Sequence, residues 1–295
     1  MANSISLVTK YQPLLDEVYK EASLTQDFET NEVKFDGSRA IKILKLVVPD
    51  LGDYSRNSGF TVGDVTATWE TWELTEDRGR EFSVDAMDNE ETLDMTFGKA
   101  SSEFVRTKVV PEIDMYRFAK IAQKSGIGGT TGTLSTGSDW EAAIAGAETA
   151  LDNAEAPKEG RVLYITPAGY QALKSTFATR FNNKADMLNR SFAEFDGMKI
   201  KVVPQGRFVD KIAKDVTTKA YSKADDGVNI NFILLHPSAV VAVAKHAKLR
   251  VFTPDVNQDM DAYKFQYRIY HDIFVYDNKV AGVYVHKLAS TPSNG

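Results

Sequence analysis

Cysteine is absent from this chain of 295 residues, which excludes a disulfide framework, a thiol nucleophile and a cysteine-ligated zinc site. Long apolar runs are absent too, because no stretch approaches the roughly 18 consecutive apolar residues of a membrane span. The first two dozen residues carry Lys10, Asp16 and Glu17, unlike the apolar core of a secretory signal peptide. We therefore expect no association with a membrane.

Clustered positive charge is also missing. Lysine and arginine total 35 against 41 acidic residues, which gives a net charge of −6 at pH 7. Tight binding to a DNA duplex requires grouped lysine and arginine side chains that displace counterions from the phosphates. The chain has no such group, so we expect no sequence-specific binding of DNA.

Catalytic and cofactor motifs are scarce. The chain lacks the Gly-x-Ser-x-Gly turn of a serine hydrolase and the Gly-Lys-Ser/Thr ending of a phosphate-binding loop. The glycine-rich stretch 126–132 follows a predicted helix rather than a strand, so it does not fit a dinucleotide site. We predict that the protein is not an enzyme and that it holds no cofactor.

Candidate metal ligands are equally few. Residues 255–259 (DVNQD) resemble the first ligands of an EF-hand, but Met260 replaces its glycine and Gln266 its final glutamate. We expect a surface turn there and no metal site. None of the four histidines stands at the i,i+4 spacing of a zinc-binding helix, and we expect structural roles for His236, His246, His271 and His286.

Two extended stretches flank a polar loop near the N-terminus. The alternation in 41–48 (IKILKLVV) predicts a strand, 49–64 is rich in Gly, Asp and Ser as loops are, and 65–75 (VTATWETWELT) predicts a second strand. Alternation places Trp69 and Trp72 on opposite faces of this ribbon. An isolated hairpin is marginal in water, so either the ribbon packs as a sheet edge within its own domain, or neighbouring subunits cover it.

A long helix is predicted from about residue 89 to 124, with Asp88 or Asn89 as its N-cap. An interior proline costs roughly 3 kcal/mol in a helix, so Pro111 raises the question of whether the helix ends at Val110. The apolar stripe keeps its phase across the proline, which favours one bent helix of roughly 50 Å. That stripe comprises Leu93, Phe97, Ala100, Phe104, Pro111, Met115, Phe118 and Ala122. On its flank, the i,i+3 spacing predicts the ion pairs Glu103–Arg106 and Asp114–Arg117.

The rest of the chain predicts a mixed unit and a terminal hairpin. The stretch 126–138 is a Gly/Thr-rich linker, and Ser138 with Glu141 fits a helix capping box. Residues 139–250 contain two strand–proline–helix units (RVLYITPAGYQALKST and NFILLHPSAVVAVAKH), and residues 262–289 predict two strands joined by a turn. The predicted fold class is α+β, with an α/β unit inserted between the long helix and the final strands.

Four stretches resemble the major capsid proteins of tailed bacteriophages, which have the Hong Kong 97-like fold. They are LGDYSRNSGF, DRGREFSVDAMDNEETLDMTFGKASSEFVRTKVVPEIDMYRF, GMKIKVVPQ and IYHDIFVYDNKVAGVYVHK. The resemblance lies in their co-occurrence and order over nearly the whole chain. It implies an N-terminal arm at 1–38, an extended loop at 39–80, a peripheral domain with a spine helix at 81–126 and 251–289, an axial domain at 127–250 and a flexible tail at 290–295.

The resemblance implies a structural protein that assembles with itself into hexamers and pentamers of an icosahedral shell around double-stranded DNA. The expected location is the virion capsid, with assembly in the host bacterial cytoplasm. Portal and cement proteins are further expected partners. The extended loop would lie over the adjacent subunit, which makes its aromatic and basic residues the candidate contacts between subunits: Tyr54, Arg56, Phe60, Trp69 and Trp72. Pro111 would mark the bend of the spine helix.

Two departures from some members of the family matter. Only a short arm precedes the extended loop, which implies a separate scaffolding protein. No lysine lies between Lys45 and Lys99, so the loop tip cannot supply the lysine of a covalent crosslink, and we expect a non-covalent shell. Two alternatives stay open: an encapsulin-type compartment, which shares the fold but encloses a cargo enzyme, and a soluble enzyme built on 139–250.

Overall fold

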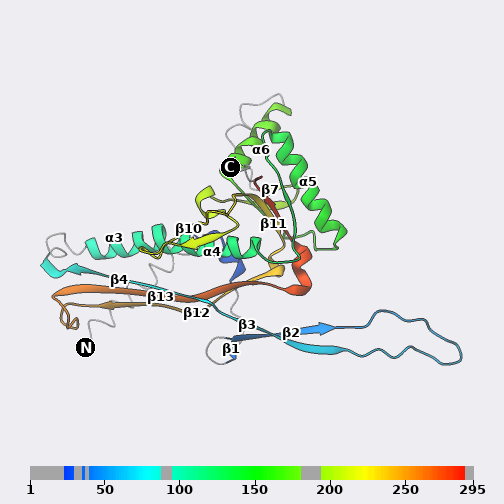
Figure 1. Ribbon diagram of the computed structural model, residues 1–295, viewed down its shortest axis with the longest axis horizontal. Coiled ribbons are helices and arrows are strands. Elements are labelled where there is room, and N and C mark those ends of the chain that lie inside the picture. Colours follow the sequence, from blue (N-terminus) through cyan, green and yellow to red (C-terminus); the bar gives the residue numbers. More distant parts are fainter. Residues whose placement is uncertain (1–22, 30–34, 37–39, 88–94, 181–193, 290–295) are drawn as a thin grey trace.

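The computed structural model describes residues 23–29, 35–36, 40–87, 95–180 and 194–289. A long flat sheet carries the spine helix along one face, a second mixed sheet with two helices rises at one end, and a narrow ribbon projects beyond that end (Figure 1). The expected tail, the expected helix cap at 88–89 and the arm before residue 23 lie outside the described residues.

The long sheet is antiparallel, with the order β12-β13-β4. Its strands are β12 (Val240–Phe252), β13 (Ala262–Val275) and β4 (Glu76–Asp85). The spine helix lies on the apolar face of this sheet, where Val105 and Val110 pack against Phe265, and Val109 and Ile113 pack against Ile269.

The second sheet has six strands in the order β5-β14-β11-β6-β8-β7. Its central strand β11 (Ile230–Leu235) is buried on both faces, which explains its continuous apolar sequence. One face packs against helices α5 (Gly137–Asn153) and α6 (Pro167–Arg180), and the other against the end of α4 (Val110–Ala122). The other strands are β5 (Gly128–Thr131), β6 (Val162–Ile165), β7 (Glu194–Phe195), β8 (Met198–Val202) and β14 (Val283–Lys287).

The smaller elements complete the chain. The ribbon consists of β2 (Ala40–Val47) and β3 (Thr66–Glu73), paired in antiparallel register with Ile41 opposite Trp72, and β1 (Phe35–Asp36) pairs with β2. Strands β9 (Ile212–Lys214) and β10 (Tyr221–Lys223) form a separate hairpin. Single turns of 3-10 helix occupy Gln26–Phe28, Gln205–Arg207 and Pro237–Ala239, and a longer one spans Asp277–Gly282.

The spine helix continues through Pro111, as predicted. Helix α3 (Met95–Phe104) passes into a π-helical segment, Val105–Val109, and then directly into α4. The amide of Val110 donates to the carbonyl of Val105, five residues back, so one extra residue enters the helix immediately before the proline. Such a π segment suits a proline, because the proline lacks a donor and its ring crowds the carbonyl four residues earlier.

The prediction of which helix residues are buried and which are exposed is partly wrong. The pair Glu103–Arg106 lies on an exposed flank at 2.7 Å, as predicted, but Asp114 and Arg117 are fully buried. Val109 and Ile113 face the sheet where the prediction placed Pro111 and Met115, which are only half-buried. The π segment shifts the helical phase, and α4 is covered on several sides, so a single apolar stripe could not describe it.

Three other predictions from the sequence are wrong. Residues 240–252 form β12 instead of a helix. Valine favours the extended conformation, and the valines of this strand lie on both faces of the sheet. The terminal strands form no hairpin, because β13 and β14 lie in different sheets. The stretch 126–138 is more than a linker, since β5 pairs in parallel with β14, and the capping box of α5 uses Thr136 and Asp139.

Candidate assembly surfaces

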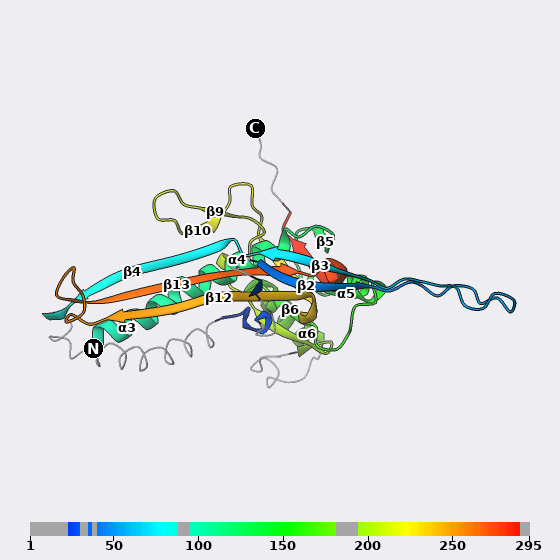
Figure 2. The ribbon, with the colours of Figure 1, turned by 90° about the horizontal axis from the view of Figure 1, so that it is seen from below.

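The tip of the ribbon is ordered by bonds between its own two arms. Ser55 and Gly59 exchange backbone hydrogen bonds at 3.1 and 2.7 Å, and the Thr61 hydroxyl donates to the Asp53 carbonyl at 2.9 Å. Gly59 has φ of 80°, a conformation that favours glycine at this turn. Strand pairing between the two arms ends at Val47 and Thr66, and an isolated bridge between Ser55 and Gly59 closes the tip, which lies well away from the rest of the molecule (Figures 1 and 2).

Large apolar side chains line this tip without cover from the other described residues. The rings of Tyr54 and Phe60 meet edge to face at 4.9 Å, yet Phe60 is 85% exposed, and the Arg56 side chain is exposed at the turn. A contiguous exposed apolar patch on a folded chain is characteristic of an interaction site. We call this set the tip patch: Val48, Leu51, Tyr54, Phe60, Val62, Val65 and Trp69.

The two tryptophans of the ribbon have different environments. Trp69 is 63% exposed, whereas Trp72 is 8% exposed and stacks on Phe274 of β13 with ring centroids 4.7 Å apart. Trp72 also donates from its indole nitrogen to Glu70 at 2.7 Å. Of the two alternatives, Trp72 fits packing within its own chain, because it belongs to the core at the ribbon root, whereas Trp69 stays exposed.

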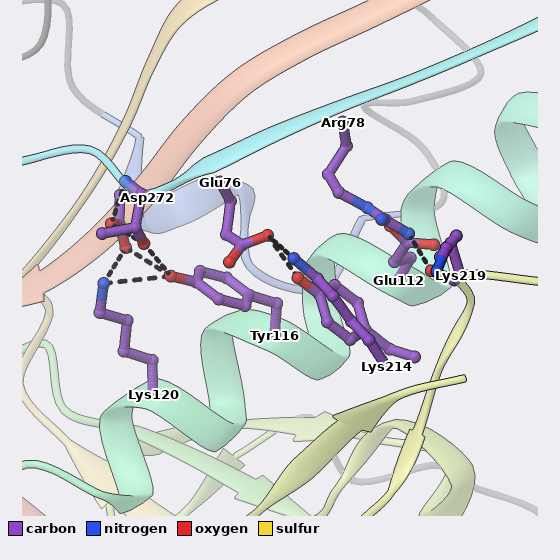
Figure 3. Close-up of polar contacts among 10 residues, drawn as sticks. Glu76, Arg78, Glu112, Tyr116, Lys120, Lys214, Lys219 and Asp272 are labelled. Carbon is purple, nitrogen blue, oxygen red and sulfur yellow. Dashed lines mark hydrogen bonds and ion pairs between the residues drawn. The ribbon is translucent and has the colours of Figure 1, made fainter. Parts of the chain in front are cut away.

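A buried carboxylate anchors that root. Asp272 on β13 is fully buried and accepts hydrogen bonds from the amide and hydroxyl of Thr75, both at 3.0 Å, and from the hydroxyl of Tyr116 at 2.9 Å. Lys120 of α4 forms an ion pair with the same carboxylate (Figure 3). Burial, and next the charge of Asp272, raise the pKa of the Tyr116 hydroxyl, so it remains a donor.

A second polar group joins the first residues of β4 to the β9–β10 hairpin (Figure 3). The Glu76 carboxylate accepts from Lys214 at 3.1 Å and from the Tyr221 hydroxyl, whose pKa is raised by burial and by this hydrogen bond. Arg78 donates to Glu112 on α4 at 2.6 Å and to the Lys219 carbonyl at 2.6 Å. A groove of about 490 Å³ runs between these groups.

The described end of the N-terminal arm is clamped onto the spine helix. Asp114 accepts from the Thr25 hydroxyl at 2.7 Å and forms an ion pair with Arg207 at 3.2 Å, while Arg117 pairs with Glu29 at 2.7 Å. Phe28 is buried in the core next to them. We call these contacts of Thr25, Glu29, Asp114, Arg117 and Arg207 the cradle. The sequence did not predict the cradle, because an acid and a base three residues apart give no sign that both are buried.

The described histidines form no metal-binding group with nearby carboxylates. Among the described residues, no group of three His, Asp or Glu side chains could hold a metal ion. His236 accepts from the Ser238 amide at 3.2 Å as a cap, and His271 and His286 are buried. Burial, together with the charges of Arg117 and Lys120, lowers the pKa of His271 to about 3, so it is neutral near pH 7.

No described helix is both long enough and apolar enough to cross a membrane. No protein-family model matches the chain, and no curated protein matches its sequence. Solved structures do match it. The mature capsid of bacteriophage PhiM1 aligns with a TM-score of 0.63 and 11% identity, over 92% of this chain and 88% of that one.

Two further matches extend the comparison. A chain from Mycobacterium phage Che8 aligns with a TM-score of 0.59 and 19% identity, over 84% of each chain. A virus-like particle from Pyrococcus furiosus aligns with a TM-score of 0.53 and 13% identity, over 94% of this chain and 98% of that one. At these identities the likeness shows that the chain shares the fold of these capsid and virus-like-particle chains, and it confirms the predicted α+β fold class.

Proposed function

We propose that this chain is the major capsid protein of a tailed bacteriophage. In this proposal, it assembles into hexamers and pentamers of an icosahedral shell, in the host bacterial cytoplasm, around double-stranded DNA. The tip patch carries the proposal, because a projecting ribbon with exposed aromatic residues stands on a fold shared with capsid chains. In this proposal the ribbon belongs to the extended loop, the β12-β13-β4 sheet with the spine helix is the peripheral domain, and the six-stranded sheet is the axial domain. Strands β12 and β14 then fall outside the residue bounds that were expected for these two domains.

Contact between subunits is assigned to the ribbon. Phe60, Tyr54 and Trp69 would bury their exposed rings on a neighbouring subunit, and Arg56 would contribute a charged contact at the rim. Each such contact is weak alone, and repetition around a closed shell makes the assembly stable. Trp72 contributes indirectly, because it fixes the ribbon root within its own subunit.

The proposal is tested by replacing the tip residue Phe60 with serine. Phe60→Ser is expected to leave the folded chain intact and to abolish closed shells, seen by negative-stain microscopy and sedimentation of protein expressed with and without its scaffolding protein. Val216→Ser is the matched control, because Val216 is 82% exposed on the hairpin loop, outside the ribbon. A parent chain that stays monomeric at every concentration, with and without scaffold, contradicts the proposal.

The proposed shell is non-covalent and acidic. No lysine occurs between Lys45 and Lys99, so boiled particles should run as a single monomer band on a denaturing gel, and a covalent ladder would refute this point. The net charge of −6 suits a container whose DNA is neutralised mainly by small counterions, without sequence-specific binding. A scaffolding protein, a portal and cement proteins complete the proposed partners.

A compartment that encloses a cargo protein is the second candidate, because a virus-like particle shares the fold over almost its full length. The contents of purified particles separate the two. Nuclease-protected double-stranded DNA supports the phage capsid, whereas a co-purifying enzyme in stoichiometric amount supports the compartment. Neighbouring genes for a portal and a terminase would point the same way as the DNA.

Pro111 is proposed as the point where the spine helix bends. The π segment Val105–Val109 directly before it supports this proposal, since such segments and prolines are the usual sites of helix kinks. Pro111→Ala restores a backbone donor to the helix. Assembly and expansion that proceed unchanged in this variant would reduce the bend to a fixed feature, whereas arrested expansion supports a hinge.

A further inference from the structure

The direction of the ribbon is set by side chains more than by a continuous sheet. The ribbon sheet β1-β2-β3 shares no strand with β12-β13-β4, and Leu74 and Thr75 are the only residues between β3 and β4. Three contacts at this junction come from β13: the stacking of Trp72 on Phe274, the hydrogen bonds to Asp272, and the hydrogen bond from the Tyr270 hydroxyl to the Leu74 carbonyl at 2.7 Å. A further contact, to the first residues of β4, comes from the β9–β10 hairpin, a part of the chain that otherwise projects from the second sheet.

The hairpin contacts two of the first residues of β4, Glu76 and Arg78. The Glu76 carboxylate, on a side chain that is 14% exposed, forms an ion pair with Lys214 and accepts a hydrogen bond from the Tyr221 hydroxyl. Arg78 lies with its guanidinium 4.9 Å from the centre of the Tyr221 ring while it donates to Glu112 and to the Lys219 carbonyl. These side chains connect β4, α4 and the hairpin at one place (Figure 3).

The loop of the hairpin is shaped to present that carbonyl. Lys219 adopts φ of 58°, a conformation uncommon for a residue other than glycine. The Asp215 carboxylate accepts from the amides of Thr217 and Thr218 at 2.9 and 2.5 Å, and the Lys219 amide donates to the Asp215 carbonyl at 3.0 Å. The turn is thus held by its own bonds, although its residues are exposed.

A small rotation at the root becomes a large movement at the tip. The strand from Arg56 to Thr75 spans about 60 Å at roughly 3.3 Å per residue, so a rotation of about 10° at the root displaces the tip by about 10 Å. Contact between subunits requires the tip patch to meet its target within a few ångströms. Whatever fixes the root angle therefore governs whether the tip patch can engage.

We propose that Glu76, Arg78, Lys214 and Tyr221 form a latch through which the β9–β10 hairpin sets the direction of the ribbon. The latch residues are positioning residues, since Glu76 and Arg78 lie on β4 just after the junction residue Thr75, and none of the four belongs to the tip patch. The inference rests on the proposed function for its consequence in assembly. The latch itself is a property of the single subunit and can be measured there.

The absence of cysteine makes a distance measurement direct, because two introduced thiols are the only labelling sites. Asn57→Cys on the tip and Ala145→Cys on α5 are both exposed positions for spin labels. Arg78→Met keeps the unbranched apolar part of the side chain and removes its charge and donors. Lys214→Gln removes a charge that pairs with Glu76 and lies over the Tyr221 ring, on a side chain that is 47% exposed. Arg106→Met is the matched control, because Arg106 is exposed and pairs with Glu103 away from the root.

In Arg78→Met, the distance distribution between the labels is expected to shift or broaden by at least about 5 Å, given the length of the lever. Lys214→Gln should produce a smaller change in the same direction, and Arg106→Met none. If Arg78→Met does not fold, Lys214→Gln and a titration of the parent chain to 1 M salt decide the question, because salt screens such half-exposed pairs. Distributions identical to the control, in the variants and in high salt, would overturn the latch.

The same chains are then tested for shell formation. A displaced ribbon with fewer closed shells in Arg78→Met supports the latch and its role in assembly. Unchanged label distances in the variants, together with normal assembly of the parent chain, overturn the latch and leave the proposed function standing. A parent chain that never assembles overturns the proposed function, while the distances still decide whether the latch exists.

Discussion

The tip patch and the cradle of the N-terminal arm differ in the burial of their side chains, and each departs from the usual rule in the opposite direction. At the tip, aromatic and aliphatic side chains such as Phe60 are left exposed, while in the cradle the charged side chains Asp114 and Arg117 are completely buried. Every buried charge of the cradle has partners within the chain, whereas the exposed rings of the tip have almost none. The cradle thus serves the fold of the single chain, and the tip is the proposed site of contacts that a single chain cannot make.

Neutralising the cradle should give the largest effect. Asp114→Asn leaves Arg207 without its carboxylate partner and removes a fully buried charge that accepts from the Thr25 hydroxyl, which is expected to lower the free energy of unfolding by about 3–5 kcal/mol. The measurement is urea unfolding followed by circular dichroism. An unfolding midpoint equal to that of the parent would show that the buried carboxylate contributes nothing to stability. It would contradict the conclusion that the cradle stabilises the fold.

The two tryptophans test the same contrast within one strand. Trp72→Ala removes a buried ring that stacks on Phe274 and should cost about 3–5 kcal/mol of stability. Trp69→Ala removes an exposed ring and should change stability by no more than about 0.5 kcal/mol, while the yield of closed shells falls. Equal losses of stability in both variants would contradict the division between root and tip.

A buried histidine should make the body, and not the tip, sensitive to acid. Because the pKa of His271 falls to about 3 on folding, the unfolded chain binds a proton between about pH 6.5 and 3 that the folded chain rejects. Stability therefore decreases as the pH drops, by about 2 kcal/mol between pH 6.5 and 5 from this group. His271→Phe, which keeps a ring against Tyr116, should lose this part of the pH dependence in urea unfolding. The same slope in both chains would exclude His271 as its source.

The exposed ion pair on the helix flank should give the smallest effect. Glu103→Gln removes the partner of Arg106, but both side chains are more than half exposed, so stability should change by no more than about 0.5 kcal/mol. Urea unfolding in low and high salt checks this value. A loss comparable to that of Asp114→Asn would mean that burial does not separate the two kinds of charge.

Local patterns were read correctly where one element decides its own structure. The alternation of 41–48 and 65–75 predicted the ribbon, and the helix passes through Pro111 as its apolar phase predicted. The pattern of residues 240–252 was misread, because a run of valine and alanine after a proline suits a helix start as well as a strand. Only the neighbouring β13 stabilises the extended form there.

By itself, the sequence determined the composition limits, the two strands of the ribbon and the helix that passes through Pro111, because these depend on side-chain chemistry and on spacing along the chain. Tertiary structure alone decided that Trp72 is buried while Trp69 is not, that β14 leaves β13 for another sheet, and that Glu76 meets Tyr221. Each of these depends on residues far apart in sequence, and alternation along one strand cannot show which face a distant segment will cover.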